Sequence, residues 1–255
     1  MPPPAPHGHP MTNQLRSDSA LIETADIALD RMAAGRHSQS ILLLAENPAY
    51  GAAALDRLSD LARDKGALVV EFDGSNPDRI LSTTAEAISD WLSHPANGKA
   101  RSATQRALNG FNRAHGLIEP ASIALKDTDI GVADSGMASI DVPDLITTTA
   151  KAAKAEGKAV LLSIRNMDKL PLETMGTLIS TLHKASQSGL PVLLFGAGRE
   201  ALRPMPATAR SYAERMFKFH TLEPSPHADQ SPDPRASGLS VPAVEKPAGP
   251  DHPKP

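Results

Sequence analysis

The chain has 255 residues, which is enough for one large domain or two small ones with a real hydrophobic core. Aromatic residues make up only 3% of it, so the apolar content is mainly aliphatic, which favours an α/β layer structure over a β-sandwich or a base-stacking nucleic-acid module. The formal net charge of -3 gives no electrostatic reason to expect nucleic acid or an anionic membrane as the main partner, and the absence of Cys excludes disulfides, thiolate chemistry and Cys-based zinc sites.

The two ends of the chain differ in composition from the middle. Residues 1–16 are Pro-rich or polar, and residues 223–255 carry repeated Pro with hardly any large apolar side chains. Neither segment can bury enough surface to offset its ordering entropy, so we expect two disordered tails around a domain at 17–222. The start lacks the features of a signal peptide and no apolar run is long enough to span a bilayer, so we expect a cytoplasmic protein without a membrane partner.

Within the expected domain, short aliphatic runs alternate with longer amphipathic stretches. A helical stripe from Ala20 to Met32 ends at Gly35, a suitable C-cap. Continuous aliphatic runs predict buried strands, which are expected at 40–45, 67–72, 158–164 and 191–195, with a last strand at 216–222. Further helices are expected at about 50–65, 77–93, 99–114, 141–156, 171–187 and 208–215.

Residues 117–133 have a different pattern, in which isolated apolar residues are separated by polar and turn residues. This spacing favours a β-hairpin insertion over a helix. Elsewhere, strands that are aliphatic throughout and followed by helices indicate a parallel sheet covered on both faces. The sequence therefore predicts a three-layer α/β domain with a mostly parallel, five-stranded sheet.

The turn after the first strand has the spacing of a phosphate-binding P-loop. Ligands of an open parallel sheet bind beyond the carboxyl ends of its strands. Here the segment AENPAYGAAAL follows the template G-x-x-x-x-G-K-[ST] with Glu46 and Gly51 at the two Gly positions, Ala52 at the Lys position and Ala53 at the Ser/Thr position. The strand before and the helix after fit this template, although a strand–turn–helix with one Gly is also common in other proteins.

The residues in this turn lack the chemistry of a P-loop. Ala52 has no cation for the phosphates, and Ala53 has no hydroxyl for Mg²⁺. Pro48 has no N–H to donate, and Glu46 brings an anion to a site for anions. Charge-assisted hydrogen bonds contribute about 1.5–3 kcal/mol each, so losing several lowers nucleotide affinity by orders of magnitude. We interpret the whole segment as a degenerate nucleotide-binding loop, formed by Glu46, Asn47, Pro48, Ala49, Tyr50, Gly51, Ala52 and Ala53.

The third strand ends in a second altered motif. Walker B motifs place a Mg²⁺-binding carboxylate, often with a second acid, after an aliphatic strand, whereas KAVLLSIRNMDKL has Arg165 and Asn166 there. Asp168 could be a displaced carboxylate, but a solvent-facing Asp near a helix start is the more ordinary interpretation. Arg165 and Glu46 either form an ion pair that fills the vacated site or both reach solvent.

Together with these two motifs, residues 17–222 resemble a bacterial AAA-family ATP-binding protein, distantly similar to archaeal and origin-recognition-type ATPases. The resemblance also covers four segments, which are specific only together: RMAAGRHSQSILLL, DSGMASIDVPDL, HKASQSGLPVLLFGAG and ARSYAERMF. It implies a P-loop NTPase-like fold with the AAA strand order, Gly196 to Gly198 near the sensor position, and Arg215 at the position of a family arginine. Family members normally continue into a helical or winged-helix region, and the expected Pro-rich tail in its place puts hydrolysis and DNA binding in doubt.

The leading hypothesis is a pseudo-ATPase that is not an enzyme and acts through protein contacts, perhaps with an intact AAA homologue. We expect no cofactor, no metal and no nucleic acid. The alternative is a protein that still binds ATP or ADP weakly, with slow or no hydrolysis, and a weaker one is a decayed gene product. The histidines His94, His115, His183 and His220 have neither metal-ligand spacing nor an obvious Ser or Asp companion, so we interpret them as surface or packing residues.

Overall fold

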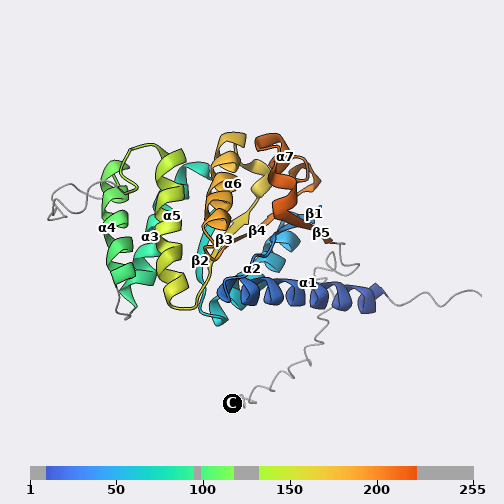
Figure 1. The fold of residues 1–255 in the computed structure, drawn as a ribbon. Helices are drawn as coiled ribbons and strands as arrows, with labels where there is room; N and C mark the ends of the chain where they lie inside the picture. Colours follow the sequence, from blue (N-terminus) through green and yellow to red (C-terminus); the bar gives the residue numbers. More distant parts are fainter. Residues whose placement is uncertain (1–9, 95–98, 118–131, 223–255) are drawn as a thin grey trace, which may run out of the picture. The chain divides into compact units, whose positions relative to one another are not determined.

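A computed structural model describes residues 10–94, 99–117 and 132–222 of the chain (Figure 1). All of these fall in the first of two units, residues 1–224. The expected hairpin insertion lies almost entirely outside the described residues, and so do residues 1–9 and the expected tail at 223–255.

Five strands form one sheet in the order β2-β3-β4-β1-β5, and every neighbouring pair is parallel. Their bounds are β1 (Ser40–Ala45), β2 (Leu68–Asp73), β3 (Val160–Arg165), β4 (Val192–Gly198) and β5 (Phe217–Leu222). The inner strands β1, β3 and β4 are buried along nearly their whole length, which is why they read as unbroken aliphatic runs. The prediction of an α/β fold with a five-stranded sheet is confirmed, and the sheet is parallel throughout.

Helices cover both faces of this sheet (Figure 1). Their bounds are α1 (Pro10–Ala33), α2 (Pro48–Asp64), α3 (Ile80–Ser93), α4 (Lys99–Ala114), α5 (Ala138–Ala155), α6 (Leu172–Gln187) and α7 (Met205–Ala209). Alternate residues of β1 enter separate cores: Ile41 and Leu43 belong to the core that includes residues of α1 and α2, whereas Leu42 and Leu44 belong to the core that includes residues of α3 to α6. The arrangement is compatible with a three-layer α/β fold.

Several helix boundaries differ from the prediction, and three of them have a clear physical reason or consequence. Helix α1 begins at Pro10, so residues 10–16 are helical and not part of a disordered tail. Pro is well tolerated in the first turn of a helix because its missing N–H has no partner there in any case. The same preference moves the start of α2 to Pro48. The single helix expected at 208–215 is wrong: α7 ends at Ala209, Arg210 is extended, and a separate 3-10 turn follows at Ala213–Met216.

No helix in the described part of the chain is long and apolar enough to cross a membrane.

Candidate functional site

The predicted turn and the predicted strand end meet at one edge of the sheet. A cavity of about 20 Å³ lies where β1, β3 and β4 end. Its walls come from the start of α2, the turn after β3 and the end of β4, and are formed by Ala45, Pro48, Gly51, Ala52, Asn166, Asp168, Lys169, Ala197, Gly198 and Arg199. The structure thus brings the two predicted segments together, as expected for strands whose carboxyl ends share an edge.

This cavity has room for about one water molecule, whereas pockets for drug-sized ligands are on the order of 300–1,000 Å³. Close packing explains its size. A Cβ added at Gly51 would lie 3.1 Å from the Cβ of Ala45, and one added at Gly198 would lie 2.8 Å from Oδ1 of Asp168. The strand ends and the start of α2 are therefore closely packed around this cavity.

The turn between β1 and α2 is short and capped by its own side chain. Asn47 is the N-cap of α2, and its Oδ1 accepts a hydrogen bond of 2.9 Å from the N–H of Ala49. The N–H of Gly51 donates to the carbonyl of Asn47 over 3.2 Å. Asn is among the strongest N-cap residues, and Pro48 has the backbone angle that a first helical position requires.

Only Glu46 and Asn47 therefore lie in the turn, and the expected loop of P-loop length is corrected to a helix start. The other members of the predicted loop lie in the first turns of α2. Glu46, Asn47, Pro48, Ala49 and Ala53 are exposed, Tyr50 and Ala52 are half-buried, and Gly51 is buried.

At the end of β3, Arg165 is paired with a residue that sequence reasoning missed. Its Nε donates to Oδ1 of Asp56 on α2 over 3.0 Å, and this hydrogen bond raises the pKa of Arg165. Of the two alternatives for Arg165 and Glu46, the ion pair between them does not form, and Glu46 is exposed. Glu46 follows β1, and β4 lies between β1 and β3, whereas α2 packs toward β3 and brings Asp56 to the guanidinium.

Asn166 has left-handed backbone angles, φ 49° and ψ 40°, which Asn tolerates better than most residues. Its Nδ2 donates to Oδ1 of Asp73, at the end of β2, over 2.9 Å, and the N–H of Ser75 donates to the same oxygen. Burial raises the pKa of Asp73, but the hydrogen bonds from Asn166 and Ser75 outweigh it, so the pKa lies below its usual value. Asp73 ends an aliphatic strand, and that position is the sequence signal that could have identified it.

Asp168 faces the end of β4 and is half-buried. Its Oδ1 accepts a hydrogen bond of 3.3 Å from the N–H of Arg199. Gly196 and Gly198, at the position where the family resemblance implies a sensor, pack against this turn: a Cβ at Gly196 would lie 2.4 Å from Sδ of Met167. The carboxylate of Asp168 therefore orders the end of β4.

A second polar cluster lies away from this edge and corrects the interpretation of His115. Asp141 is 0% exposed and receives four hydrogen bonds, from Nε2 of His115 (2.9 Å), from the N–H (3.0 Å) and Oγ (2.8 Å) of Ser135, and from the N–H of Gly136 (2.9 Å). His115 thus has an Asp companion, which the sequence did not reveal because residues 117–133 separate them in the chain. Ser135 bonds to Asp141 and not to the imidazole, so the cluster is not arranged to activate a nucleophile.

His183 and His94 occupy ordinary surroundings. The ring of His183 lies 4.8 Å from that of Tyr212, centroid to centroid, at a tilt of 41°, and Nδ1 of His94 lies 2.9 Å from the carbonyl oxygen of Asp90. Across the described ranges, no three His, Asp or Glu side chains are grouped so that they could hold a metal ion.

No protein-family model, curated protein or solved structure matches this chain.

Proposed function

We propose that the chain is an AAA-type pseudo-ATPase, which does not hydrolyse ATP and acts through contacts with other proteins. The observation that carries this proposal is the start of α2. Asn47 caps the helix and Pro48 begins it, so the backbone that would surround a phosphate group is helical. The proposed loss of phosphate-binding groups therefore includes the backbone of the site as well as the side chains at Ala52 and Ala53.

The position of β4 between β1 and β3 supports the P-loop part of the proposal. It is the order that the AAA resemblance implies, in which the sensor strand separates the strands of the two Walker motifs. The degenerate turn and the altered strand end also line one cavity, as the two halves of a nucleotide site would.

The hydrogen bonds of the polar side chains near this cavity support the proposal that the protein does not hydrolyse ATP. Phosphoryl transfer depends on positioned charge around the transferred group and on a bound metal ion. Here Arg165 is paired with Asp56, Asn166 with Asp73, and Asp168 with the N–H of Arg199. Each of these three side chains is already engaged within the protein.

A steady-state phosphate-release assay with a heat-treated control tests the proposal, and we expect release at the level of the control. The single substitutions Ala52→Lys and Arg165→Asp should not restore turnover, because each leaves the other half of the Mg²⁺–phosphate site missing. Turnover well above the control that is lost in Arg165→Ala would overturn the pseudo-ATPase proposal.

Titration with a fluorescent ATP analogue, with and without Mg²⁺, addresses the alternative of a nucleotide-binding protein. We expect no saturable binding, because the cavity of about 20 Å³ does not admit a phosphate group without movement of α2. Mg²⁺-dependent binding in the micromolar range would favour that alternative. Co-purification of the full chain with an intact AAA homologue would identify the kind of partner that the resemblance suggests.

A further inference from the structure

A groove lies between the start of α3 and the first turns of α5 and α6. We call it the α3 groove; its volume is about 300 Å³. Its floor is aliphatic, formed by Ile80, Leu81, Val142 and Leu178, and its rim carries the carboxylates of Asp78 and Glu173. The groove therefore combines an apolar interior with acidic edges.

A second, acidic section of about 430 Å³ shares Ile80 with the groove. Glu71, Asp73 and Glu86 line this section together with the guanidinium groups of Arg79 and Arg165. The two sections together carry five carboxylates and two guanidinium groups, so the potential along the groove is negative.

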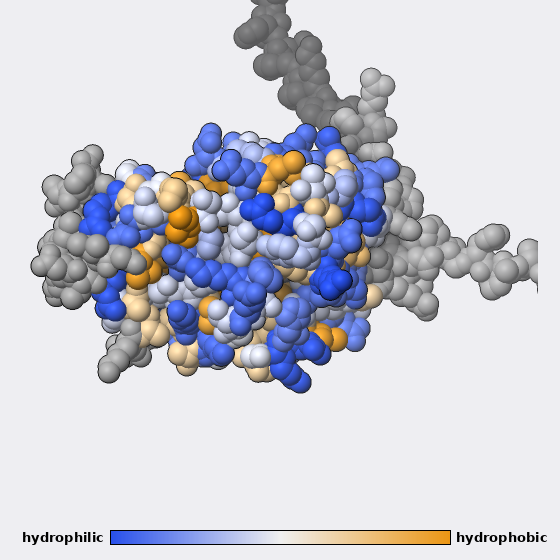
Figure 2. Space-filling view, turned by 45° about the horizontal axis from the view of Figure 1, so that its top comes forward, coloured by the Kyte–Doolittle hydropathy of each residue, from blue (hydrophilic) through white to orange (hydrophobic). Residues whose placement is uncertain are grey.

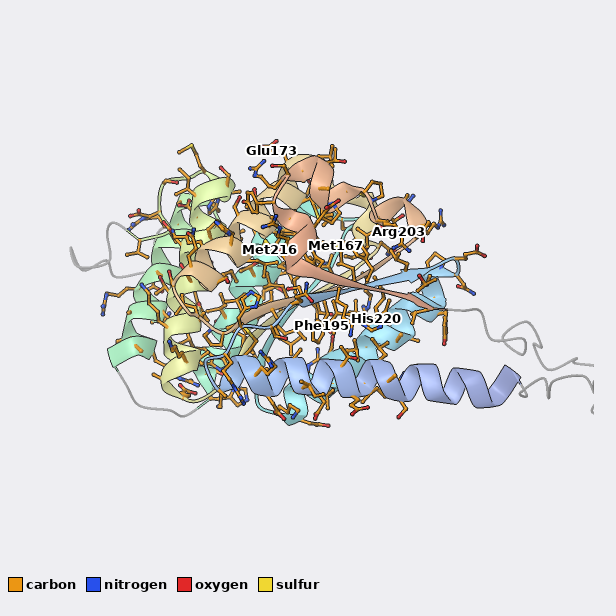
Figure 3. The ribbon with its side chains drawn as sticks, turned by 45° about the vertical axis from the view of Figure 1, so that its right-hand side comes forward. Met167, Glu173, Phe195, Arg203, Met216 and His220 are labelled. Carbon is orange, nitrogen blue, oxygen red and sulfur yellow. The ribbon has the colours of Figure 1, made fainter. Side chains whose placement is uncertain are left out.

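Three of these carboxylates are available to a partner. Glu71 is paired with Arg63 over 2.8 Å and Asp73 is bonded to Asn166. By contrast, Asp78, Glu86 and Glu173 are exposed and form no ion pair with any residue that the structure describes. Glu173 lies at the outer end of α6 (Figure 3).

Exposed apolar side chains lie at the starts of the two helices that flank the groove. Met137 immediately precedes α5 and is 53% exposed, and Leu172 begins α6 and is 47% exposed. The face shown in Figure 2 is mostly hydrophilic, with hydrophobic side chains in separate small groups. Single exposed apolar side chains are ordinary on protein surfaces, so the apolar character of the binding surface comes from the floor of the groove.

We propose that the α3 groove binds a basic amphipathic helix of a partner protein. Leu or Met side chains of that helix would enter the section lined by Leu81 and Leu178, and its Lys or Arg residues would face Asp78, Glu86 and Glu173. A helix in an apolar groove uses anchors spaced three or four residues apart, and complementary charge sets its orientation. The negative potential disfavours nucleic acids and anionic lipid surfaces as occupants. The inference rests on the proposed function in one respect, that the chain acts through protein contacts.

Fluorescence anisotropy with the full chain and synthetic peptides tests the groove. The probe is a labelled helical peptide of about 14 residues with Leu at two positions four apart and Lys on the flanking positions. Two matched peptides replace every Lys by Glu or both Leu by Ser. We expect the probe to bind, with an affinity that falls as salt is added, and both matched peptides to bind at least about tenfold more weakly.

Variants of the protein locate the binding. We expect Glu86→Lys and Glu173→Lys each to lower the affinity for the probe peptide about two- to fivefold, and the double variant to lower it further. Thr174→Phe, which narrows the apolar section, should also weaken it. Glu23→Lys makes the same charge change on an exposed residue of α1 and should leave binding unchanged. Circular dichroism confirms that each variant is folded. If a variant does not fold, the comparison of the probe with the two matched peptides on the unmodified protein still tests the inference.

Equal binding of the Glu peptide, or unchanged binding by the Glu86→Lys, Glu173→Lys double variant, would overturn the inference. The phosphate-release assay on the same sample separates it from the proposed function. ATP turnover together with peptide binding would defeat the pseudo-ATPase proposal alone. No turnover and no peptide binding would defeat the groove alone, and turnover without peptide binding would defeat both.

Discussion

At the scale of single residues, Asp141 shows how a buried charge is accommodated in this protein. The carboxylate receives donors from His115, at the end of α4, and from Ser135 and Gly136, just before α5. These donors lie on both sides of the segment 118–131 in the sequence. A buried carboxylate is tolerated only when it is paired and fully hydrogen-bonded, and here it joins the two ends of that segment.

Asp141→Asn is therefore expected to destabilise the protein by about 2–4 kcal/mol, because the amide replaces one acceptor oxygen by a donor that faces other donors. Urea denaturation followed by circular dichroism measures the effect. Asp64→Asn, at an exposed position at the end of α2, is the matched control and should change stability by less than about 0.5 kcal/mol. Similar values for the two variants would contradict a structural role for Asp141.

The surroundings of His220 on β5 predict that the stability of the protein depends on pH. Burial, with Lys218 nearby, lowers its pKa below the ordinary value of 6.5, and its Nε2 is a buried atom with no hydrogen-bond partner among the described residues. Between the lowered pKa and 6.5 the unfolded chain binds more protons than the folded protein, so stability is lost as the pH falls through this window. We expect His220→Leu to lose less stability than the unmodified protein between pH 7.5 and pH 5.5. His37→Leu, an exposed control, should not alter this difference; a matching effect there would refute the assignment.

At the scale of elements, the ends of β2 and β3 are locked together by close backbone contact. The N–H of Gly74 donates to the carbonyl of Arg165 over 2.8 Å. A Cβ added at Gly74 would lie 2.3 Å from the carbonyl oxygen of Asn166, whose own backbone is left-handed. Only glycine fits this position, because the neighbouring atom is backbone and cannot move aside alone.

Gly74→Ala should destabilise the protein by about 2–4 kcal/mol, since β2 and β3 must separate to admit the methyl group. Gly176→Ala is the comparison: its Cβ would meet the flexible end of Arg210 at 3.1 Å, and the gain in helix propensity of about 1 kcal/mol offsets that contact. Denaturation midpoints of the two variants give the comparison. A smaller loss of stability in Gly74→Ala than in Gly176→Ala would contradict the close contact between position 74 and the carbonyl of Asn166.

The strands and most helices could be predicted because hydrophobic periodicity reports burial directly. The start of α2 was missed because Asn47 and Pro48 satisfy two patterns, a P-loop spacing and a helix cap, and only the second is realised. The partners of Arg165 and His115 were missed for another reason. Asp56 and Asp141 are brought close by tertiary packing, which has no periodic signal in the sequence.

At the scale of the described unit, two hydrophobic cores lie on opposite faces of one sheet. Both cores include residues of β1, β3 and β4. Unfolding of one core would therefore expose one face of the strands on which the other core is built. The only Trp, Trp91, belongs to the core beneath α3 to α6, is 8% exposed, and lies under the guanidinium of Arg101 at 4.0 Å. Its fluorescence therefore reports on that core alone.

We expect Trp91 fluorescence and far-ultraviolet circular dichroism to give coincident unfolding curves in urea, because a shared sheet couples the two cores into one cooperative transition. Arg101→Lys, which disturbs the surroundings of Trp91, should shift both curves together. A fluorescence transition at lower urea than the circular dichroism transition would mean that α3 and α4 unfold before the sheet.

The hydrogen bond from Asn166 to Asp73 affects whether the proposed loss of ATPase chemistry could be reversed by mutation. If the chain has the AAA-type origin that we propose, an acid once stood at the position of Asn166, and Asn166→Asp is a single substitution that the left-handed backbone tolerates. In this chain, however, the new carboxylate would face Asp73 at hydrogen-bonding distance, and like charges repel. Regaining activity would require Asp73, Arg165 and the start of α2 to change together, so the proposed loss of ATPase chemistry is protected against reversal one substitution at a time.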